Sequence, residues 1–473
     1  MAIVPPASPP VDPPGDGRHP TVSVVSVNYN GRAYLEPFLQ SVLALDYPPS
    51  CYRVVLVDNG STDGSVPLVR ERFPQVRIVE AGDNLGFAGG CNLGIRATTS
   101  EYVALVNNDT VVEPGWLRPL VEVAEADPRV GLVGSKLLFL TSFLDVGLEA
   151  FVEGLERPSD SSAPTLELRE ARVLGCDYDK LIVRSGHLGA GQDGGRPVHT
   201  LAPSARLAVP VAQADAPATL VLTLRALRPG RNLPVGVFAG DAEIERLEVT
   251  HTPRTFRLEV SREIVARAAR DVINNAGTRI DGEGRFGDRG IFEFDDGQYD
   301  LVVDMPALCG ASVLLRREML ERIGGFDTRY FMYFEDVDLS WRASRAGWRL
   351  VYTPRSRLRH VHAGTSREGS PRWVFLVTRN HLFWLIKHGR MWAALYGVSA
   401  FYARTLRRAL PAMARRFVRH DQSGSATMDA VDLQVARSLA RHLPGLLVSR
   451  YRPRGVDGAD RWTAVMRGGP TSG

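Results

Sequence analysis

The stretch TVSVVSVNYNGRAYLEPFLQSVLALDYPPSCYRVVLVDNGSTDGSVPLVRERFPQVRIVEAG, residues 21–82, decides the fold class. Its apolar, β-branched runs alternate with amphipathic stretches at 34–45 and 66–73. Strand, helix, strand, helix and strand in this order predict a parallel sheet covered by helices. Ligands bind such sheets at the carboxyl ends of the strands. Three polar segments fall at predicted strand ends: 28–31, 58–63 and 107–109.

The 473 residues exceed what a single hydrophobic core organises, so we expect several domains. Between 141 and 270 the chain changes to short alternating runs such as ARLAVPV, TLVLTLRAL and LPVGVFAG, separated by turn residues. This spacing indicates an inserted β-sandwich-like module. The predicted segments are a disordered Pro-rich tail (1–20), a sheet-and-helix half (21–140), the β-rich insert (141–270), a second sheet-and-helix half (271–372) and a basic amphipathic helical region (373–473).

Composition excludes several classes of protein. With 44% hydrophobic and 23% charged residues the chain is typical of a water-soluble protein, and a net charge of +4 is too small to indicate nucleic acid as a partner. The four cysteines form no C-x-x-C motif, so we expect neither a disulfide framework nor a zinc site. The tail lacks an apolar stretch that could serve as a signal peptide, and we therefore expect a cytoplasmic protein.

The C-terminal region is basic and aromatic. From His381 onward it holds 15 Lys or Arg against 5 Asp and no Glu. This imbalance suits peripheral contact with the anionic inner face of the plasma membrane. An ordinary helical pair that covers the catalytic core explains the same pattern. No run reaches the roughly 20 apolar residues that a membrane-spanning helix needs.

The first candidate site residues follow the first two strands. Asn28 and Asn30 end the first strand, and Asp58 and Asn59 end the second. A carboxylate at a buried strand end can accept hydrogen bonds from a uracil or thymine imide or from ribose hydroxyls, and burial without a partner is costly. The alternative for Asp58 is that it caps the turn at 59–64.

A glycine-rich stretch, GDNLGFAGGCNLGIRA at 82–97, forms the second candidate. We expect its glycines to let the backbone approach a ligand, and its polar start, with Asn84 before Gly86, to begin a helix that carries phosphate. A dinucleotide-binding dehydrogenase is the competing interpretation. The first strand is followed by NYNGRAYL and not by the G-x-G-x-x-G that such a fold requires.

Oxygen ligands for a cation are predicted where YVALVNNDTVVEPGWL ends its strand at Asn107, Asn108 and Asp109. Hard divalent cations prefer such ligands and keep contact with phosphate oxygens. Asn-Asp after a strand is also a common turn. His360 and His362 alternate on a later strand, so only one can readily enter the same site, and imidazole is an acceptable ligand for manganese.

An acidic pair, Glu335 and Asp336, precedes the helix predicted for EDVDLSWRASRAG. A positioned carboxylate can remove the proton of an acceptor hydroxyl as that hydroxyl attacks the anomeric carbon of a sugar. Capping of the helix by Asp336 uses the same atoms and remains the alternative.

Seven motifs in this order resemble the family 2 glycosyltransferases of the GT-A fold, and most of all their rhamnosyltransferase-like branch: SVVSVNYNG, VLVDNGSTDGS, NLGFAGGCNLGI, VALVNNDTVVEPGWL, CGASVLLRR, GGFDTRYFMYFEDVDLSWRASRAGW and RHVHAGTS. The resemblance covers about 21–140 and 271–388. It implies a mixed, mostly parallel sheet flanked by helices, with a nucleotide-sugar-binding half at 21–140 and an acceptor and catalytic half at 271–372. The insert and the C-terminal helical extension lie outside this common fold.

The resemblance also implies roles for individual residues. Asp58 matches the nucleoside-contacting acid, and Asn84 and Gly86 lie in the donor-binding loop. Asp109 matches the last acid of the metal-binding D-x-D element, with Asn108 beside it in the donor site. Further on, Asp336 matches the general base with Glu335 its neighbour, and His360 matches the histidine that completes the metal site, with His362 in reserve. The D-x-D position reads Asn107-Asn108-Asp109, which leaves a single carboxylate for Mg²⁺ or Mn²⁺.

The activity expected from the resemblance is inverting transfer of a sugar, with L-rhamnose from dTDP-rhamnose as the leading candidate, to a cell-surface glycan or lipid-linked acceptor. Glucosyl, galactosyl and mannosyl donors remain alternatives. A non-catalytic glycan-binding protein on a degenerate scaffold is the rival from another class. A processive synthase is disfavoured because the matching region reads DLSWRASRAGW and has no Q-x-x-R-W motif.

Overall fold

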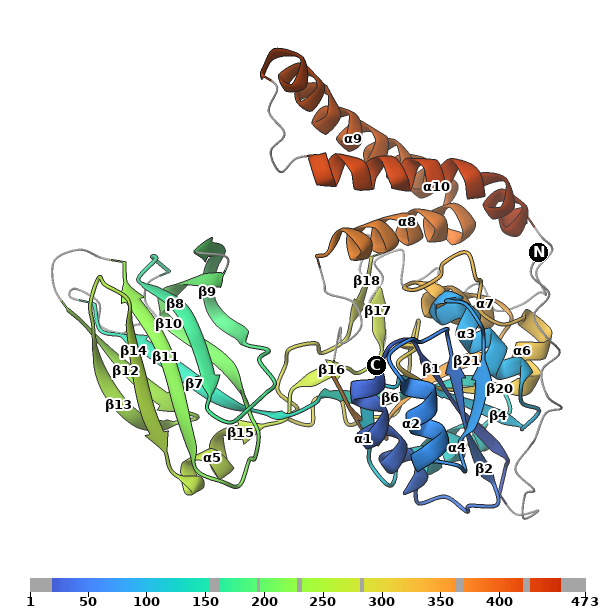
Figure 1. The fold of residues 1–473 in the computed structure, drawn as a ribbon, viewed down its shortest axis with the longest axis horizontal. Helices are drawn as coiled ribbons and strands as arrows, with labels where there is room; N and C mark the ends of the chain where they lie inside the picture. Colours follow the sequence, from blue (N-terminus) through green and yellow to red (C-terminus); the bar gives the residue numbers. More distant parts are fainter. Residues whose placement is uncertain are drawn as a thin grey trace. The chain divides into compact units, whose positions relative to one another are not determined.

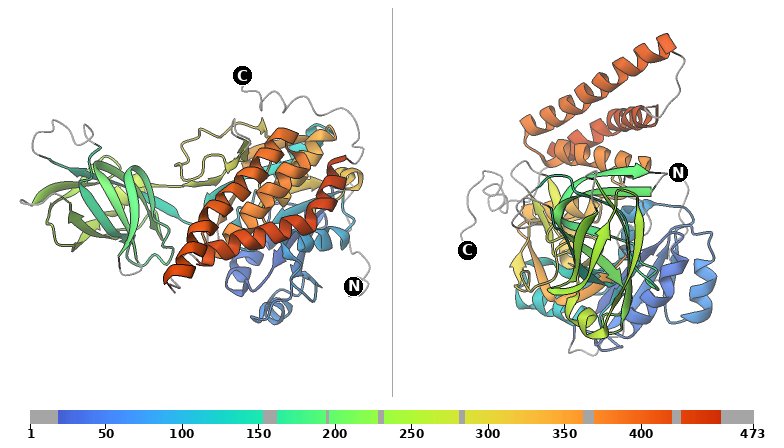
Figure 2. Two further views of the ribbon diagram at one scale, coloured as in Figure 1. Left: turned by 90° about the horizontal axis from the view of Figure 1, so that it is seen from above. Right: turned by 90° about the vertical axis from the view of Figure 1, so that its left-hand side faces the viewer.

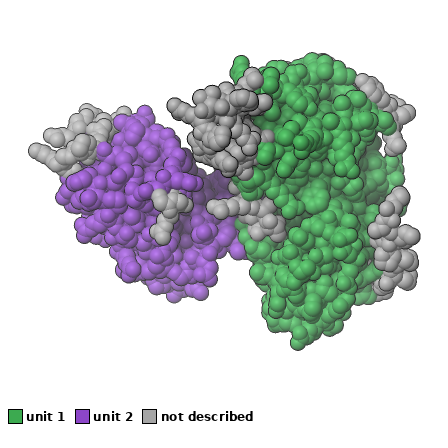
Figure 3. Space-filling view, turned by 45° about the horizontal axis from the view of Figure 1, so that its top comes forward, with its two compact units in different colours: residues 1–137, 275–289, 300–473 green, residues 138–274, 290–299 purple. Residues whose placement is uncertain are grey.

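The computed structural model describes residues 19–152, 162–193, 196–227, 232–280, 285–361, 369–419 and 426–451. The chain divides into two compact units, coloured separately in Figure 3. Unit 1 comprises residues 1–137, 275–289 and 300–473, and unit 2 comprises 138–274 and 290–299. The predicted disordered tail lies outside the described residues as far as residue 18.

Unit 1 is built on a ten-stranded mixed sheet with the strand order β19-β21-β6-β20-β4-β1-β2-β3, to which β16 and β5 add by pairing with β6 and β21 (Figure 1). Four predicted strands run parallel, three from the opening stretch and one from YVALVNNDTVVEPGWL: β1 (Val22–Asn28), β2 (Tyr52–Asp58), β3 (Arg77–Glu80) and β4 (Tyr102–Val106). The remaining strands are β5 (Thr110–Val112), β6 (Val130–Phe139), β16 (Ile273–Asn275), β19 (Val303–Asp304), β20 (Ser312–Arg316) and β21 (Arg349–His360).

Both faces of the parallel strands are buried, which explains their continuous apolar sequences. On one face, α1 (Arg32–Leu43) and α4 (Leu117–Ala126) share a core with Val22 and Val24 of β1. On the other face, α3 (Gly86–Arg96) packs on β1 and β2. The other helices of this part are α2 (Ser65–Arg72), α6 (Arg317–Ile323) and α7 (Glu335–Arg345).

Two glycines of α3 have a different role from the one we expected. A Cβ at Gly94 would lie 2.3 Å from Val25, and one at Gly90 would lie 2.6 Å from Val27. Both glycines therefore let the helix pack closely on the sheet. We expected these two glycines to let the backbone approach a ligand, and for these positions the prediction was wrong.

The antiparallel strand β20 joins the two halves of the unit 1 sheet. It lies between β4 and β6 and pairs with both, although it follows the insert in sequence. The residues around Gly310 that precede β20 are thereby brought beside the carboxyl end of β4. The strand predicted for ASVLLRR is confirmed.

Unit 2 contains a single nine-stranded antiparallel sheet, ordered β13-β12-β7-β10-β8-β11-β14, with β15 and β9 paired to β7 and β10. End strand β13 approaches β14 and β11, so the sheet folds over a shared apolar core. The elements are β7 (Ser142–Ala150), β8 (Leu166–Val173), β9 (Ile182–Asp193), β10 (Arg196–Val211), β11 (Ala218–Ala226), β12 (Leu233–Ala239), β13 (Ala242–Val249), β14 (Arg254–Val260), α5 (Arg262–Ala268) and β15 (Ala269–Arg270).

Three C-terminal helices complete unit 1: α8 (Pro371–His388), α9 (Met391–Arg419) and α10 (Ala426–Tyr451), seen from two further directions in Figure 2. Helix α8 contacts both α9 and α10, and its buried side chains share a core with Tyr330, Val337 and Trp341. The hairpin of β17 (Thr278–Ile280) and β18 (Phe286–Asp288) packs on this core through Phe286. Within the described residues, no helix is both long and apolar enough to span a bilayer.

Candidate functional site

The carboxyl ends of β1, β2 and β4 are joined by side-chain hydrogen bonds. The Asn28 amide donates to Asp58 Oδ1 at 3.3 Å, and Asn108 Nδ2 donates to Asn28 Oδ1 at 2.7 Å. All three side chains are buried. Gly31 makes this approach possible, because a Cβ there would lie 2.3 Å from the Asn108 amide. Candidates from three separate segments therefore meet at one edge of the sheet.

Asp58 also organises the turn that follows it. Its Oδ2 accepts the backbone N–H groups of Gly60 and Ser61 at 3.2 and 3.0 Å. This is the geometry of the turn-capping alternative. Asn30, with a φ of 51°, is held against the same turn because its Oδ1 accepts from Thr62 at 2.8 Å. Contact between Asp58 and a nucleoside remains a prediction.

Asn59 and Asn84 both hold the start of α3. Asn59 Nδ2 donates to the Gly86 carbonyl at 2.9 Å, and Asn84 Oδ1 accepts from the Gly86 N–H at the same distance. Gly86 has a φ of 73°, and a Cβ there would lie 2.5 Å from the carbonyl oxygen of Phe331. Only glycine fits this position without strain.

Asp109 and His360 form the candidate metal pair. Asp109 lies between β4 and β5, directly before Thr110, and its Oδ1 lies 3.2 Å from His360 Nε2 at the end of β21. Both residues are buried, and their strands pair, with His360 opposite Thr110. His362 lies outside the described residues.

The described part of the chain contains no cluster of three or more His, Cys, Asp or Glu residues able to hold a metal. Asp109 and His360 supply one oxygen and one nitrogen ligand. Mg²⁺ and Mn²⁺ in transferase sites commonly take a small number of protein ligands and complete their coordination with water and substrate phosphates. This donor pair therefore fits a cation that arrives with a diphosphate, and does not fit an all-protein cage.

The acidic pair begins α7. Asp336 Oδ2 accepts the backbone N–H of Gly310 at 2.9 Å, and its Oδ1 accepts that of Val337 at 2.8 Å. The residue that caps α7 is Phe334, whose side chain makes no cap hydrogen bond, so the N-cap alternative for Asp336 is wrong. Glu335 is 5% exposed, and its Oε2 has no hydrogen-bond partner among the described residues.

The two carboxyl groups differ in the ease of ionisation. Burial, and then the charge of Asp336, raises the pKa of Glu335 well above its ordinary value. Burial also raises the pKa of Asp336, while the N–H groups of Gly310 and Val337 lower it in part. Burial thus favours the neutral form of both groups, and Asp336 has in addition two N–H donors that favour its ionised form. An ionised carboxylate of raised pKa has the properties of a general base.

The segment before the acidic pair has an unusual backbone. Phe331, Tyr333 and Phe334 have φ values of 66°, 71° and 71°. Left-handed conformations cost non-glycine residues roughly 1–2 kcal/mol each and persist only where surrounding contacts impose them. The carbonyl oxygen of Phe331 accepts the Ala88 N–H of α3 at 3.1 Å, which connects this segment to the glycine-rich stretch.

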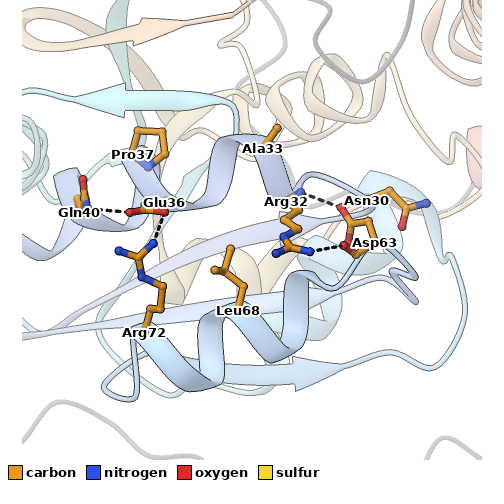
Figure 4. A pocket seen from close by; sticks show the side chains of 9 residues that line it. All are labelled: Asn30, Arg32, Ala33, Glu36, Pro37, Gln40, Asp63, Leu68 and Arg72. Atoms are coloured by element: carbon orange, nitrogen blue, oxygen red, sulfur yellow. Dashed lines mark hydrogen bonds and ion pairs between the residues drawn. The ribbon is translucent and has the colours of Figure 1, made fainter.

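Backbone contacts connect the acidic pair to the strand ends. Asp336 binds the Gly310 N–H, and the next carbonyl, of Ala311, accepts the Asn107 N–H at 3.0 Å. Asn108 then reaches Asn28 and through it Asp58. These hydrogen bonds thus connect Asp336 with Asn108, Asn28 and Asp58 along this edge of the sheet. Asn30 faces outward and lines a hollow between α1 and α2 (Figure 4), together with Arg32, Ala33, Glu36, Pro37, Gln40, Asp63, Leu68 and Arg72.

Helix α8 also supports the site, and this contribution was not predicted from the sequence. Its Arg379 and Asn380 bind backbone carbonyls of the segment before the acidic pair, and both are buried. The only signal in the sequence was an adjacent Arg-Asn in an otherwise apolar helix pattern. Gly310 belongs to the motif CGASVLLRR, but its contact with Asp336 arises from the tertiary structure and cannot be predicted from the motif.

Comparison with known proteins identifies two matching regions. Residues 23–143 match Glycosyl transferase family 2, and residues 292–385 match Glycosyltransferase like family 2. The chain is 26% identical over 384 residues to the N-acetylglucosaminyl-diphospho-decaprenol L-rhamnosyltransferase of Mycobacterium tuberculosis, covering 78% of this chain and 86% of that protein. It is 36% identical over 115 residues to a glycosyltransferase of Nostoc sp., covering 24% and 35% of the two chains.

Two solved structures are also similar. The mannosyltransferase PcManGT of Pyrobaculum calidifontis, in complex with GDP-Man and Mn²⁺, is 15% identical with a TM-score of 0.39, covering 92% of this chain and 89% of that one. GalNAc-T7 with UDP, GalNAc and Mn²⁺ is 11% identical with a TM-score of 0.44, covering 92% and 59%.

The strand order of unit 1 and the two family matches on either side of the insert define a glycosyltransferase, an enzyme that transfers a hexose. The fold class expected from the resemblance, a GT-A sheet flanked by helices, is confirmed. The resemblance to the family 2 glycosyltransferases is confirmed over these two regions, and the similarity to an L-rhamnosyltransferase extends over 78% of the chain.

Proposed function

We propose that this glycosyltransferase moves L-rhamnose from dTDP-L-rhamnose to a hydroxyl group of a lipid-linked glycan, with inversion at the anomeric carbon. The donor and acceptor are suggested by the mycobacterial relative, whose name specifies an L-rhamnosyltransferase that acts on a diphospho-decaprenol. The observation that carries the proposal is the position of Asp336, a half-buried carboxylate linked through Gly310 and Ala311 to the strand end that holds Asn108 and Asp109.

Asp336 acts as the base in this proposal. Its carboxylate takes the proton of the acceptor hydroxyl, and the acceptor oxygen forms a bond to the anomeric carbon. The bond from that carbon to the diphosphate breaks at the same time, and the diphosphate leaves with the electron pair. A single displacement of this kind inverts the anomeric centre. Glu335, which keeps its proton, adds no second negative charge beside the base.

The donor is proposed to lie along the strand ends. Asn28, Asp58 and Asn59 would contact the nucleoside, and Asn84 with Gly86 would orient the diphosphate at the start of α3. Backbone N–H groups at a helix start favour anions. Asp109 and His360 would hold the cation, which supplies positive charge to the departing diphosphate when it is bound.

A screen of nucleotide sugars tests the proposal. We expect dTDP-L-rhamnose with Mn²⁺ to raise the melting temperature of the full chain more than UDP- or GDP-sugars do, because a ligand that binds only the folded state stabilises it. Transfer to a polyprenyl-diphosphate-linked acceptor should give the anomer opposite to that of the donor, as measured by NMR. A product that retains the donor configuration would overturn the single-displacement mechanism, and transfer only from another donor would overturn the sugar assignment.

We also propose that α9 contacts the surface of the membrane that carries the acceptor. Large apolar side chains at helical spacing are exposed on α9, with Trp392 64% and Tyr396 73% exposed. The helix has six Arg and no acidic residue. Exposed Trp and Tyr beside Arg suit the interface of an anionic bilayer.

Vesicle sedimentation tests this contact. The full chain should bind vesicles that contain anionic phospholipid and bind neutral vesicles more weakly. Trp392→Ser with Tyr396→Ser should reduce the binding, whereas Leu188→Ser, an exposed apolar position of unit 2, should not. Equal binding by both variants would contradict a role for α9.

A further inference from the structure

Helix α8 holds the segment 329–334 through one buried side chain. Asn380 is fully buried, and its Nδ2 lies within hydrogen-bond distance of three carbonyl oxygens: those of Tyr330 at 2.9 Å, Met332 at 2.8 Å and Tyr333 at 2.7 Å. These carbonyls bracket Phe331, one of the residues in the left-handed conformation. The contacts therefore impose the strained backbone that precedes Glu335.

Arg379 orients that amide. Its Nε donates to Asn380 Oδ1 at 2.8 Å, so the amide nitrogen of Asn380 must point toward the carbonyls. A guanidinium Nη2 also donates to the Tyr330 carbonyl at 2.6 Å. Burial lowers the pKa of Arg379 to about 10, a value at which the guanidinium still carries its charge at neutral pH.

The same helix holds the other side of the acidic pair. Lys387 Nζ and His388 Nε2 lie 2.5 and 2.7 Å from Asp338 Oδ1, and Arg342 of α7 binds the second oxygen at 2.8 Å. Burial would raise the pKa of Asp338, but Arg342, His388 and Lys387 lower it well below its ordinary value. Contacts to α8 thus lie on both sides of residues 335 and 336.

The bracketed carbonyl of Phe331 also reaches the glycine-rich stretch. It accepts the Ala88 N–H, and Gly86 passes so close that a Cβ would lie 2.5 Å from that oxygen. One peptide group therefore fixes the distance between the start of α3 and the start of α7. In the proposed function these two helix starts carry the donor diphosphate and the base.

We infer that Arg379 and Asn380 are positioning residues that set the acidic pair against the donor-binding loop through the carbonyl of Phe331. The inference rests on the proposed function for the identification of the base and of the donor-binding loop. The coupling between segments 329–334 and 84–91 does not depend on that function. Neither residue touches the reacting atoms. Their effect is on the geometry of the base relative to the donor, and a small displacement of a catalytic group lowers the rate steeply.

The test compares Asn380→Asp with Leu382→Ala in the full chain. Asn380→Asp keeps the shape of the side chain and replaces the donor NH₂ by an oxygen that faces three carbonyls. Leu382→Ala removes a buried contact from the same helix on its side toward Gly397 of α9, and controls for loss of packing. Arg379→Lys keeps the positive charge and removes the bond to Asn380 Oδ1, which provides a milder variant should Asn380→Asp fold poorly.

Amide hydrogen exchange measures the coupling without any substrate. We expect Asn380→Asp, and Arg379→Lys to a smaller extent, to speed exchange in both 84–91 and 329–338, while Leu382→Ala leaves the two segments within about twofold of the wild type. Faster exchange in 329–338 alone, or equal changes in the control, would overturn the inference.

Kinetics measure the consequence for catalysis. Relative to Leu382→Ala, we expect Asn380→Asp to lower kcat by about tenfold or more and to leave the KM for the donor within about threefold. A lower kcat at a nearly unchanged KM indicates that the chemical step is impaired while donor binding is not. A kcat equal to that of the control would overturn the positioning role. If the wild type transfers no sugar, the proposed function fails, and the exchange experiment alone then decides whether the two segments are coupled.

Discussion

Asp109 Oδ1 and His360 Nε2 lie 3.2 Å apart, although the insert and the whole acidic segment separate them in sequence. The pairing of β5 with β21 brings them together. This relationship gives the candidate metal site its two protein ligands. We propose that His360 supplies the second ligand where the D-x-D position offers a single carboxylate.

Replacing either member should weaken cation binding. We expect His360→Ala to lower the affinity for Mn²⁺ in the presence of dTDP by about tenfold or more, measured by calorimetry, because imidazole is one of two protein ligands. His251→Ala, an exposed histidine of unit 2, is the control. Unchanged Mn²⁺ affinity in His360→Ala would place the cation elsewhere.

Removing the proposed base should stop transfer and spare donor binding. Asp336→Asn keeps the size of the side chain but cannot accept a proton, and general-base catalysis contributes about 10²–10⁴-fold. We expect a loss of kcat in that range, with donor affinity by calorimetry within about threefold of the wild type. Transfer within about tenfold of the wild-type rate would exclude Asp336 as the base.

The raised pKa of Glu335 predicts a pH-dependent stability. At low pH, Glu335 is protonated in both the folded and the unfolded chain, and it costs nothing. Between the ordinary pKa of a glutamate and the raised pKa of the folded state, the unfolded chain ionises while the folded chain keeps its proton, so the free energy of unfolding falls as the pH rises and levels off above the folded pKa. Glu335→Gln removes this loss.

We therefore expect Glu335→Gln to melt at a higher temperature than the wild type at about pH 9, with the difference shrinking toward about pH 5. Glu321→Gln, at an exposed position of α6, is the control. A difference that grows as the pH falls would show that Glu335 is ionised in the folded protein.

Gly86→Ala tests the contact between the two helix starts. Gly86 and Gly82 have similar φ values of 73° and 79°, but a Cβ at Gly86 would meet Phe331, whereas one at Gly82 would meet nothing within 4 Å. Both variants lose about 1 kcal/mol of stability to backbone strain. Gly86→Ala should lose about 1–3 kcal/mol more because of overpacking, measured by denaturant unfolding. Equal losses would show that Phe331 moves aside freely.

Much of this molecule can be predicted from local sequence. Alternating apolar and amphipathic runs predict β1 to β4, because buried parallel strands must be apolar on both faces. Strand-end polar residues such as Asn28, Asp58 and Asp109 are predicted because parallel strands end at one edge of a sheet. The helix at Glu335 follows from its periodicity.

Other features depend on contacts that no local pattern contains. Gly90 and Gly94 resemble ligand-binding glycines, but their role is set by Val25 and Val27 on the strand beneath them. The role of Asn380 depends on three carbonyls some fifty residues earlier. The N-cap alternative for Asp336 was wrong because α7 begins at Glu335 with Phe334 as its N-cap residue, which places Asp336 within the first turn.

The position of β20 between β4 and β6 affects the order in which the chain can fold during synthesis. Unit 2 ends at residue 299, so all of its residues are synthesised before β20 at 312–316. The sheet of unit 2 can therefore close while unit 1 still lacks this central strand. Until residue 316 emerges, β4 and β6 expose unpaired edges, which are prone to aggregation. The inserted module can therefore close before the unit 1 sheet, which is complete only when β21 (349–360) has also emerged to pair with β6.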